Sequence, residues 1–225
     1  MSWDIDLQAL WLTLKLAMLT VVILLMVCLP AAWLLNKYQG RFKPVIEALI
    51  TLPLVLPPTV LGFYLLMAFS PNAWLGNAWL QVTGEQLTFS FTGILLGSLI
   101  YSLPFVMQPL MSGLSQLGEA FEQQAASLGI VTWKRFAYLL LPLLKPSIIS
   151  AATLGFAHTL GEFGLVLMIG GNIPGETQVL SIALYNHVEL LEYQQAHNLA
   201  ALLLLCSFLS LLLLYKFNRP LADIR

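Results

Sequence analysis

Five long apolar runs constrain this chain more than any other feature of its sequence. Four of the runs carry no charged residue and one carries a single carboxylate, and each could cross the roughly 30 Å hydrocarbon core of a bilayer as a helix. Because lipid offers the backbone no hydrogen-bonding partner, such runs are expected to be helical. The sequence therefore predicts an all-α, polytopic membrane protein, a single domain over residues 1–225, with five transmembrane helices: Leu16–Leu35, Ala48–Phe69, Phe91–Met111, Ser147–Gly170 and Leu199–Tyr215.

Composition excludes a water-soluble globular domain. Only 9% of the 225 residues are charged and 59% are hydrophobic, whereas soluble domains carry about 25% charged residues. The net charge of −1 gives no indication of a nucleic-acid partner. Cys28 and Cys206 lie in apolar runs and are expected to be small buried hydrophobes, so no disulfide or metal site is predicted. The N-terminal segment carries Asp4 and Asp6 but no basic residue before Lys15, which argues against a cleaved signal peptide.

Basic residues predict the orientation of the chain. The segments on one side of the predicted membrane carry nine of the ten Lys and Arg residues: Lys37, Arg41, Lys43, Lys134, Arg135, Lys145, Lys216, Arg219 and Arg225. The opposite segments, 70–90 and 171–198, carry none, and Lys15 lies at the edge of the first run. Since cytoplasmic loops are enriched in Lys and Arg, we expect the N-terminus outside and the C-terminus inside a bacterial cytoplasmic (inner) membrane.

Three prolines interrupt the second run. Pro53, Pro57 and Pro58 each remove a helical hydrogen bond, at a cost of about 3 kcal/mol in an ordinary helix interior. The sequence therefore predicts a kinked or unwound segment, which is tolerated inside a membrane where it faces protein or a water-filled cavity. Either a simple structural kink or a segment lining a pathway would explain it.

Glu162 is the one carboxylate inside a predicted span. A charge at the bilayer centre costs about 2.5–3.5 kcal/mol, so Glu162 is expected to face the interior of the helix bundle. His158, four residues earlier, is expected on the same helical face, where it could pair with Glu162. Gly161 and Gly164 are expected to allow close helix approach. Three roles stay open for Glu162, namely bundle stabilisation, gating and proton relay, whereas binding of an anion is disfavoured by its charge.

The inner segment Ser112–Pro146 is too regular for a simple linker. Its composition predicts a helix from Glu119 to Leu128, ended by Gly129, and a second helix before Pro142. An amphipathic helix lying on the lipid headgroups is the plainest interpretation.

The spacing within this segment resembles the cytoplasmic loop of the membrane subunits of ABC importers. That loop has the pattern E-A-A-x-x-x-G, nine residues, then I-x-L-P. Here Ala125, Gly129, Leu141 and Pro142 match, Gln123 stands in place of the family's Glu, and Glu122 lies one residue early. The resemblance implies that 119–141, including Glu119, forms a coupling helix that docks on an ATP-hydrolysing subunit.

Three further motifs look like the molybdate-transporting branch of this family: Leu52–Pro58 (LPLVLPP), Leu160–Gly164 (LGEFG) and Gly171–Thr177 (GNIPGET). The resemblance implies ATP-driven import of molybdate by a homodimer of this chain, with two ATP-binding subunits inside and an oxyanion-binding protein outside. Tungstate and sulfate stay open as cargo. No Gly-x-x-x-x-Gly-Lys-Ser/Thr motif occurs, so the chain is not expected to be an enzyme or to bind a cofactor; ATP and Mg would be used by the partner ATPase.

The outer segments are expected to receive the binding protein. No Lys or Arg lies inside a predicted span, so tight binding of a dianion within the membrane is not expected. Asn172, Gly175 and Thr177 could offer neutral donors beside Pro174, although an ordinary turn explains the same residues. The apolar stretch Gln178–Leu191 is expected to form an interfacial or re-entrant helix, with a sixth short span as the alternative. A proton-coupled secondary transporter using Glu162 and His158 is the competing functional hypothesis.

Overall fold

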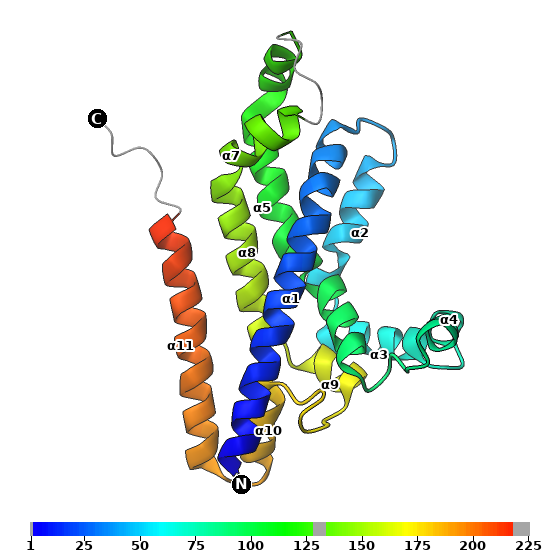
Figure 1. Cartoon of the computed structure of the whole chain (residues 1–225), viewed down its shortest axis with the longest axis vertical. Helices are drawn as coiled ribbons and strands as arrows, with labels where there is room; N and C mark the ends of the chain where they lie inside the picture. Colours follow the sequence, from blue (N-terminus) through cyan, green and yellow to red (C-terminus); the bar gives the residue numbers. More distant parts are fainter. Residues whose placement is uncertain (1, 128–133, 218–225) are drawn as a thin grey trace.

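The computed structural model of the chain describes residues 2–127 and 134–217, and regular structure within these two ranges is helical throughout. Four helices run roughly along the long axis of the molecule, namely α1 (Ser2–Lys37), α5 (Phe91–Ser127), α8 (Lys145–Leu160) and α11 (Tyr193–Phe217) (Figure 1). The shorter helices are α2 (Lys43–Val55), α3 (Pro58–Phe69), α4 (Trp74–Thr83), η1 (Arg135–Leu140), α7 (Leu141–Leu143), α9 (Gly164–Gly170) and α10 (Leu180–Glu189). The all-α prediction is confirmed for the described part of the chain.

The core is formed where α1, α5 and α8 pack against one another. Its buried side chains come from all three helices and include Leu24, Cys28, Ala32, Val106, Leu110, Leu114 and Ala151. Helix α8 approaches α5 so closely that a Cβ on Gly155 would lie 2.7 Å from Cγ2 of Val106. Cys28 is fully buried here, as predicted, while Cys206 of α11 is half-buried, and both thiols are free.

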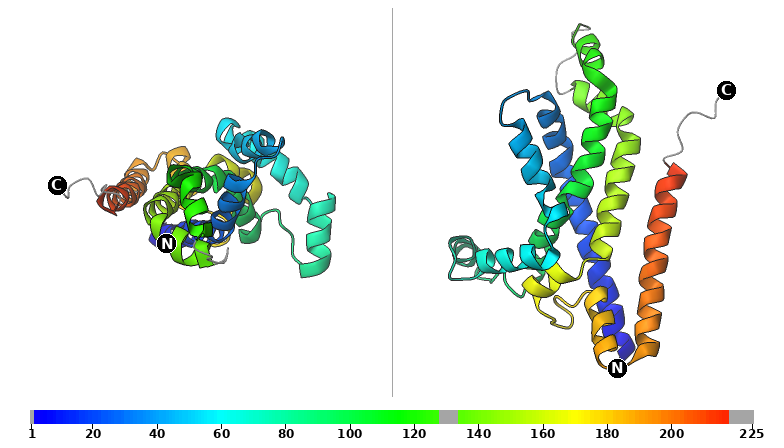
Figure 2. Two further views of the ribbon diagram at one scale, coloured as in Figure 1. Left: turned by 90° about the horizontal axis from the view of Figure 1, so that it is seen from above. Right: turned by 180° about the vertical axis from the view of Figure 1, so that it is seen from behind.

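Helix α11 and the pair α3–α4 lie on opposite sides of this core. Helix α11 packs against α8 and α10. Helices α3 and α4 project sideways, and Figure 2 shows this projection from above and from behind. The N-terminal end of α1 and helix α10 share one end of the molecule, whereas the α1–α2 turn and helix α7 lie at the other (Figure 1).

The second predicted span, Ala48–Phe69, is not one continuous helix. Helices α2 and α3 meet at an angle of 111°. The sequence explains the break, because Leu56 and Pro57 each precede a proline and adopt extended backbone (ψ 135° and 136°). Pro58 then occupies the first turn of α3, where its missing N–H costs nothing.

The fourth predicted span, Ser147–Gly170, is also interrupted, so the prediction of one helix over these residues is wrong. Helix α8 ends at Leu160 and α9 begins at Gly164. Gly161, Glu162 and Phe163 form a non-helical connection between them. At its other end α8 is bent by 67° from the preceding segment, Phe136–Leu143.

Within the described residues, three single helices are long and apolar enough to cross a membrane: Asp6–Lys37, Phe91–Gly118 and Tyr193–Lys216. The count rises to five if each bent pair, α2–α3 and the pair ending in α8, is taken as one span. The helices that correspond to the first and third predicted spans are therefore longer than predicted. The predicted short helix within Gln178–Leu191 is present as α10, which spans only 10 residues.

Helix α5 contains one sharp break near its C-terminal end. Gly118 has positive φ (72°, ψ 164°), so the backbone leaves the helix there and a short helix follows over 119–127. The predicted helix beginning at Glu119 is thus present as far as Ser127. Gly129, predicted to end it, lies outside the described residues.

Candidate functional site

Glu162 lies at the α8–α9 connection and is almost fully buried, with 3% of its surface exposed. The hydroxyl of Ser98 on α5 donates a hydrogen bond of 2.7 Å to its Oε2. The hydroxyl of Ser181 on α10 donates one of 2.6 Å to the Glu162 backbone carbonyl. The second carboxylate oxygen, Oε1, is buried and has no partner among the described residues. This one residue therefore joins three parts of the bundle.

His158 does not pair with Glu162, which corrects the sequence prediction. Its Nδ1 lies 2.9 Å from the Ser102 hydroxyl, one helical turn along α5 from Ser98. The imidazole stacks on Phe105, with ring centroids 3.8 Å apart, and lies 4.6 Å from the ring of Tyr101. The reason is that α8 ends at Leu160, so positions 158 and 162 do not share one helical face.

The two interrupted segments meet at their breaks. A Cβ on Gly164 would lie 3.4 Å from side-chain atoms of both Pro58 and Thr59, and one on Gly62 would lie 2.9 Å from Cβ of Met168. Helices α3 and α9 therefore touch almost backbone to backbone, as expected for Gly164. Gly161 departs from the prediction, because it is exposed and a Cβ there would meet only the carbonyl oxygen of His158, at 3.9 Å.

The prolines of the second segment divide into two roles. Pro57 and Pro58 form the α2–α3 break, with Pro57 exposed and Pro58 half-buried. Pro53 is buried inside α2 and lies away from the break. The predicted unwound segment is thus two residues long, Leu56–Pro57.

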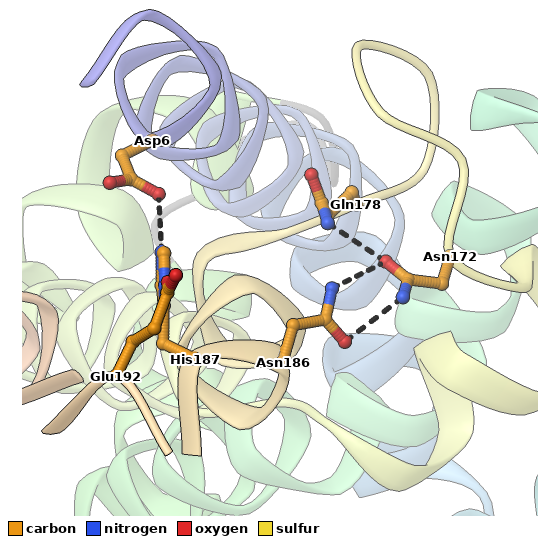
Figure 3. A network of polar contacts seen from close by, with 6 residues as sticks. All are labelled: Asp6, Asn172, Gln178, Asn186, His187 and Glu192. Atoms are coloured by element: carbon orange, nitrogen blue, oxygen red, sulfur yellow. Dashed lines mark hydrogen bonds and ion pairs between the residues drawn. The ribbon is translucent and has the colours of Figure 1, made fainter. Parts of the chain in front are cut away.

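A cluster of side-chain amides fixes the loop that follows α9 (Figure 3). Oδ1 of Asn172 accepts hydrogen bonds from Nε2 of Gln178 (2.9 Å) and Nδ2 of Asn186 (3.2 Å), and its Nδ2 donates to Oδ1 of Asn186 (3.0 Å). Thr177 is fully buried, and its hydroxyl donates to the Gly170 carbonyl at 2.7 Å. Asn172 and Thr177 are therefore engaged in holding the loop, which favours the turn over an anion site.

The rest of this loop is an exposed turn. Pro174 and Gly175 are both exposed, and Gly175 adopts positive φ (80°), which favours glycine. These two residues stay available for contact with another molecule.

An ionic cluster joins three helices beside the amide cluster (Figure 3). Nε2 of His187 lies 3.1 Å from Oδ1 of Asp6 on α1, and its Nδ1 lies 2.7 Å from Oε2 of Glu192, just before α11. Because both ring nitrogens face carboxylates, both need a proton to donate. Burial lowers the pKa of His187, but the hydrogen bonds and charges of Asp6 and Glu192 outweigh it and raise the pKa above its ordinary 6.5.

Several polar residues in this arrangement were not predicted. Ser98 and Ser181 bond to Glu162 in the α8–α9 connection, and Ser102 bonds to His158 and Thr159 near the end of α8. Thr13 of α1 accepts a 2.7 Å hydrogen bond from the Leu180 amide at the start of α10. A signal was present, because each is a polar residue in or beside an apolar helix, where an internal partner is required.

The predicted inner-loop residues lie at the opposite end of the molecule from the amide cluster. Glu119, Glu122, Gln123 and Ala125 belong to the short helix after Gly118. Leu141 is half-buried and Pro142 exposed, and both follow the wide helical turn of η1, in which the Leu141 amide donates to the Phe136 carbonyl. The described residues contain no group of three or more His, Cys, Asp or Glu side chains that could hold a metal ion.

Fold and site define a polytopic helical membrane protein with two helical segments that are broken inside the bundle. Residues 28–221 match the family of binding-protein-dependent transport system inner membrane components, and the chain belongs to that family.

Individual relatives are similar over most of the chain. It is 48% identical to the molybdenum transport system permease protein ModB of Azotobacter vinelandii, covering 95% of each chain. It is 34% identical to the ModB of Haemophilus influenzae, covering 92% of this chain and 91% of that one. It is also 34% identical to the sulfate transport system permease protein CysT of Escherichia coli, covering 83% of this chain and 66% of CysT.

The fold is also found in a solved structure. A chain of a bacterial alginate ABC transporter, solved in complex with an alginate pentasaccharide-bound periplasmic protein, matches 96% of this chain with a TM-score of 0.76. That match covers 79% of the alginate transporter chain at 14% identity, so it concerns the fold alone.

Proposed function

We propose that this chain is the membrane-spanning permease subunit of an ATP-driven importer that carries molybdate into the cell. The observation that carries this proposal is the 48% identity over 95% of both chains to a molybdenum permease, against 34% to a sulfate permease. Tungstate, which has the same charge and tetrahedral shape as molybdate, is the natural second cargo.

The proposed arrangement in the membrane has five spans, with the N-terminus outside and the C-terminus inside. Counting α2–α3 and the bent pair ending in α8 as one span each supports the number five. The basic residues Lys37, Arg41, Lys43, Lys145 and Lys216 all belong to the end of the molecule opposite the N-terminus, which supports the orientation. Lys15 is the exception, and its ammonium lies 4.3 Å from the centre of the Phe91 ring.

The working assembly would contain two copies of this chain, two ATP-hydrolysing subunits inside and an oxyanion-binding protein outside. The short helix after Gly118 and the segment around Leu141 and Pro142 would contact the ATPase. The exposed turn at Pro174 and Gly175 would face the binding protein. Closure of the ATPase pair would then move the inner segments and reorient the spans.

Glu162 would stabilise the joint between the inner and outer halves of this bundle. It accepts from Ser98 on α5 and, through its backbone, from Ser181 on α10. A displacement of α8 would therefore reach α9 and α10 through Glu162. A proton relay through Glu162 is the second candidate, which its unpartnered Oε1 favours, although His158 is bonded to Ser102 instead.

Two measurements test the proposal. Purification of the chain in mild detergent from its native membrane should bring down an ATP-hydrolysing chain. Uptake of molybdate by cells should be inhibited by excess tungstate and little affected by excess sulfate. Absence of an ATPase partner, or uptake that responds to sulfate alone, would overturn it.

A further inference from the structure

Helices α3 and α4 lie across the direction in which the long helices run. Helix α3 leaves α2 at an angle of 111°. Figure 1 shows α4 end-on, whereas the view from above in Figure 2 shows it lengthwise, so its axis is crosswise to α1 and α5. Because α1 and α5 have the length and hydropathy of membrane spans, the axis of α4 lies in the plane of the membrane.

The contacts around α4 show its depth relative to the long helices. Leu87, just after α4, is buried in one cluster with Leu12 and Leu16 of α1. Lys15 lies between these two leucines, and its ammonium is 4.3 Å from the centre of the Phe91 ring at the start of α5. A lysine on an apolar helix keeps its charged group at the boundary between lipid and water. Helix α4 is therefore level with that boundary.

Exposed aromatic side chains gather at the same level. Trp11 of α1, Trp74 of α4 and Phe89, just before α5, have 69%, 84% and 50% of their surfaces exposed. Tryptophan is enriched where a membrane meets water, because its large apolar ring carries one polar N–H group. Trp11 and Trp74 have the position and the exposure of such boundary residues.

The segment that contains α4 carries no charge. Residues 70–84 include no Lys, Arg, Asp or Glu, whereas about 25% of the residues of soluble domains are charged. A stretch of this composition is unusual for a surface that faces only water.

One side of α4 is fixed to the bundle. Gly76 is buried, and a Cβ there would collide with the backbone oxygens of Phe69 and Ser70 at the end of α3. Trp79 packs against the buried cluster that contains Phe69 and Leu87. Helix α4 therefore has a defined orientation, and its remaining sides face outward.

The outward sides of α4 differ in polarity. Trp74, Ala78 and Val82 are spaced four residues apart and form an exposed apolar strip, with 84% of Trp74 and 85% of Val82 exposed. Asn77 and Gln81 form an exposed polar strip beside it, and Nε2 of Gln81 donates a 2.7 Å hydrogen bond to Oδ1 of Asn77. A helix with this division, lying in the membrane plane, matches an interfacial amphipathic helix.

We propose that α4 is an interfacial helix, immersed at the boundary between the headgroups and the acyl chains of one leaflet. The apolar strip contacts lipid, and the polar strip faces the headgroups. Helix α4 thereby holds the adjoining end of α3 at a fixed depth. Because Asn77 and Gln81 are neutral, the contact does not require anionic lipid. The inference goes beyond the proposed function and does not depend on the cargo.

The test uses the full chain, purified from native membranes into lipid nanodiscs, with Cys28 and Cys206 replaced by Ala. A nitroxide spin label is attached to a single cysteine in place of Ala78 or Val82, and the same label in place of Gln81 is the matched control. Collisions with oxygen, which concentrates in lipid, are compared with collisions with a neutral nickel complex, which stays in water. The ratio of the two should be at least about threefold higher on the apolar strip, because that strip is buried among acyl chains, and it should not change with the content of anionic lipid.

Two results would overturn the inference. Equal ratios at the three positions, with the nickel complex reaching all of them, would show that α4 stands in water. Labels on the apolar strip that neither reagent reaches would show that protein covers the strip, and a disulfide between two Val82→Cys chains would identify a second copy as that protein.

Tryptophan fluorescence gives a second measurement that needs no cysteine. Lipids brominated at the upper part of their acyl chains should quench part of the fluorescence of the unlabelled chain, and Trp74→Phe should reduce the quenched part. A quenched part that is the same with and without Trp74 would contradict contact of Trp74 with lipid.

Discussion

At the scale of single residues, the buried polar contacts of Glu162 distinguish this bundle from a purely apolar one. A carboxylate with 3% exposure must be held by specific donors. Here the hydroxyl of Ser98 donates to one carboxylate oxygen of Glu162, and the hydroxyl of Ser181 donates to the backbone carbonyl of the same residue. The α8–α9 connection thus depends on a few short hydrogen bonds.

Replacing Ser98 by Ala should destabilise the protein. The change removes the donor from Oε2 of Glu162, so that both carboxylate oxygens are buried without a donor, and such a loss costs about 1–3 kcal/mol. Ser210→Ala is the matched control, because Ser210 is also buried but bonds only to the Cys206 carbonyl of its own helix. Unfolding in detergent with increasing denaturant would measure both; equal effects of the two substitutions would contradict the role given to Ser98.

His187 makes the contact between α1, α10 and the start of α11 sensitive to pH. Its pKa is raised above 6.5 in the folded chain, so its contribution to stability is complete below the unfolded pKa and is lost as pH rises through the folded pKa. His187→Gln should therefore lower the midpoint of thermal unfolding by about 2–4 °C near pH 6 and by less near pH 8.5. The acidic side chains that face the imidazole and raise its pKa are Asp6 and Glu192. A difference between the two proteins that grows toward high pH would show the sign to be wrong.

At the scale of helices, two breaks determine the shape of the bundle, and their contact positions α3 against α9. Pro57 and Pro58 set the first break by local backbone chemistry. The second, at Gly161–Phe163, has no proline and is held by tertiary contacts, including that of Gly164 with Pro58 and Thr59.

A disulfide can report on this contact. With Cys28 and Cys206 replaced by Ala, the pair Gly62→Cys and Met168→Cys should cross-link on mild oxidation. A Cβ at position 62 would lie 2.9 Å from Cβ of residue 168, so a small separation of α3 and α9 brings the pair to the roughly 3.5–4.5 Å between Cβ atoms that a disulfide requires. Adding Pro57→Ala and Pro58→Ala should reduce cross-linking, since a straighter α2–α3 moves α3 away from α9. Pro53→Ala, inside α2, is the control and should leave the yield unchanged. Undiminished cross-linking without Pro57 and Pro58 would contradict their role.

Much of the helix pattern was predictable from the sequence, and the reasons for the remainder are local. The lengths of the apolar runs predicted the approximate positions of the spans. The motif LPLVLPP (52–58) predicted the α2–α3 break, because proline changes the backbone at its own position and the one before it. The end of α8 at Leu160 was not predictable, since Gly161 and Gly164 are compatible with a membrane helix and the connection after it is held by tertiary contacts with α3, α5 and α10. That error also led to the wrong pairing of His158 with Glu162. The break at Gly118, which has positive φ, was not predictable either, because the local sequence does not distinguish Gly118 from Gly113 five residues earlier.

At the scale of the whole molecule, the proposed coupling segment and the amide cluster lie at opposite ends of the bundle, and the buried Glu162 lies between them. The end that carries the short helix after Gly118 and the segment before Pro142 is the one proposed to face the cytoplasm. At the other end the amide cluster holds its loop, and His187 of α10 contacts Asp6 of α1 and Glu192, next to α11. The proposed relay of motion across the membrane would require a connection between these two ends.

Gly129→Asp should abolish molybdate uptake while leaving membrane insertion intact. Gly129 lies outside the described residues but within the segment proposed to dock on the ATPase, where an added carboxylate would disturb the contact. Gln86→Asp is the control, because Gln86 is exposed between α4 and α5 at a position that does not have positive φ. Uptake per amount of membrane protein is the measurement, and normal uptake by the Gly129 variant would contradict the coupling role.

The central claim, that ATP hydrolysis by partner subunits drives an oxyanion through this chain, is tested most directly by uptake into proteoliposomes containing the chain, its co-purifying ATPase and a molybdate-binding protein. With ATP supplied to the ATPase side, molybdate should accumulate inside the proteoliposomes. Accumulation should continue when the pH gradient is removed, and in the Glu162→Gln variant it should still require ATP. Accumulation without the ATPase, driven by a pH gradient alone, would contradict the account.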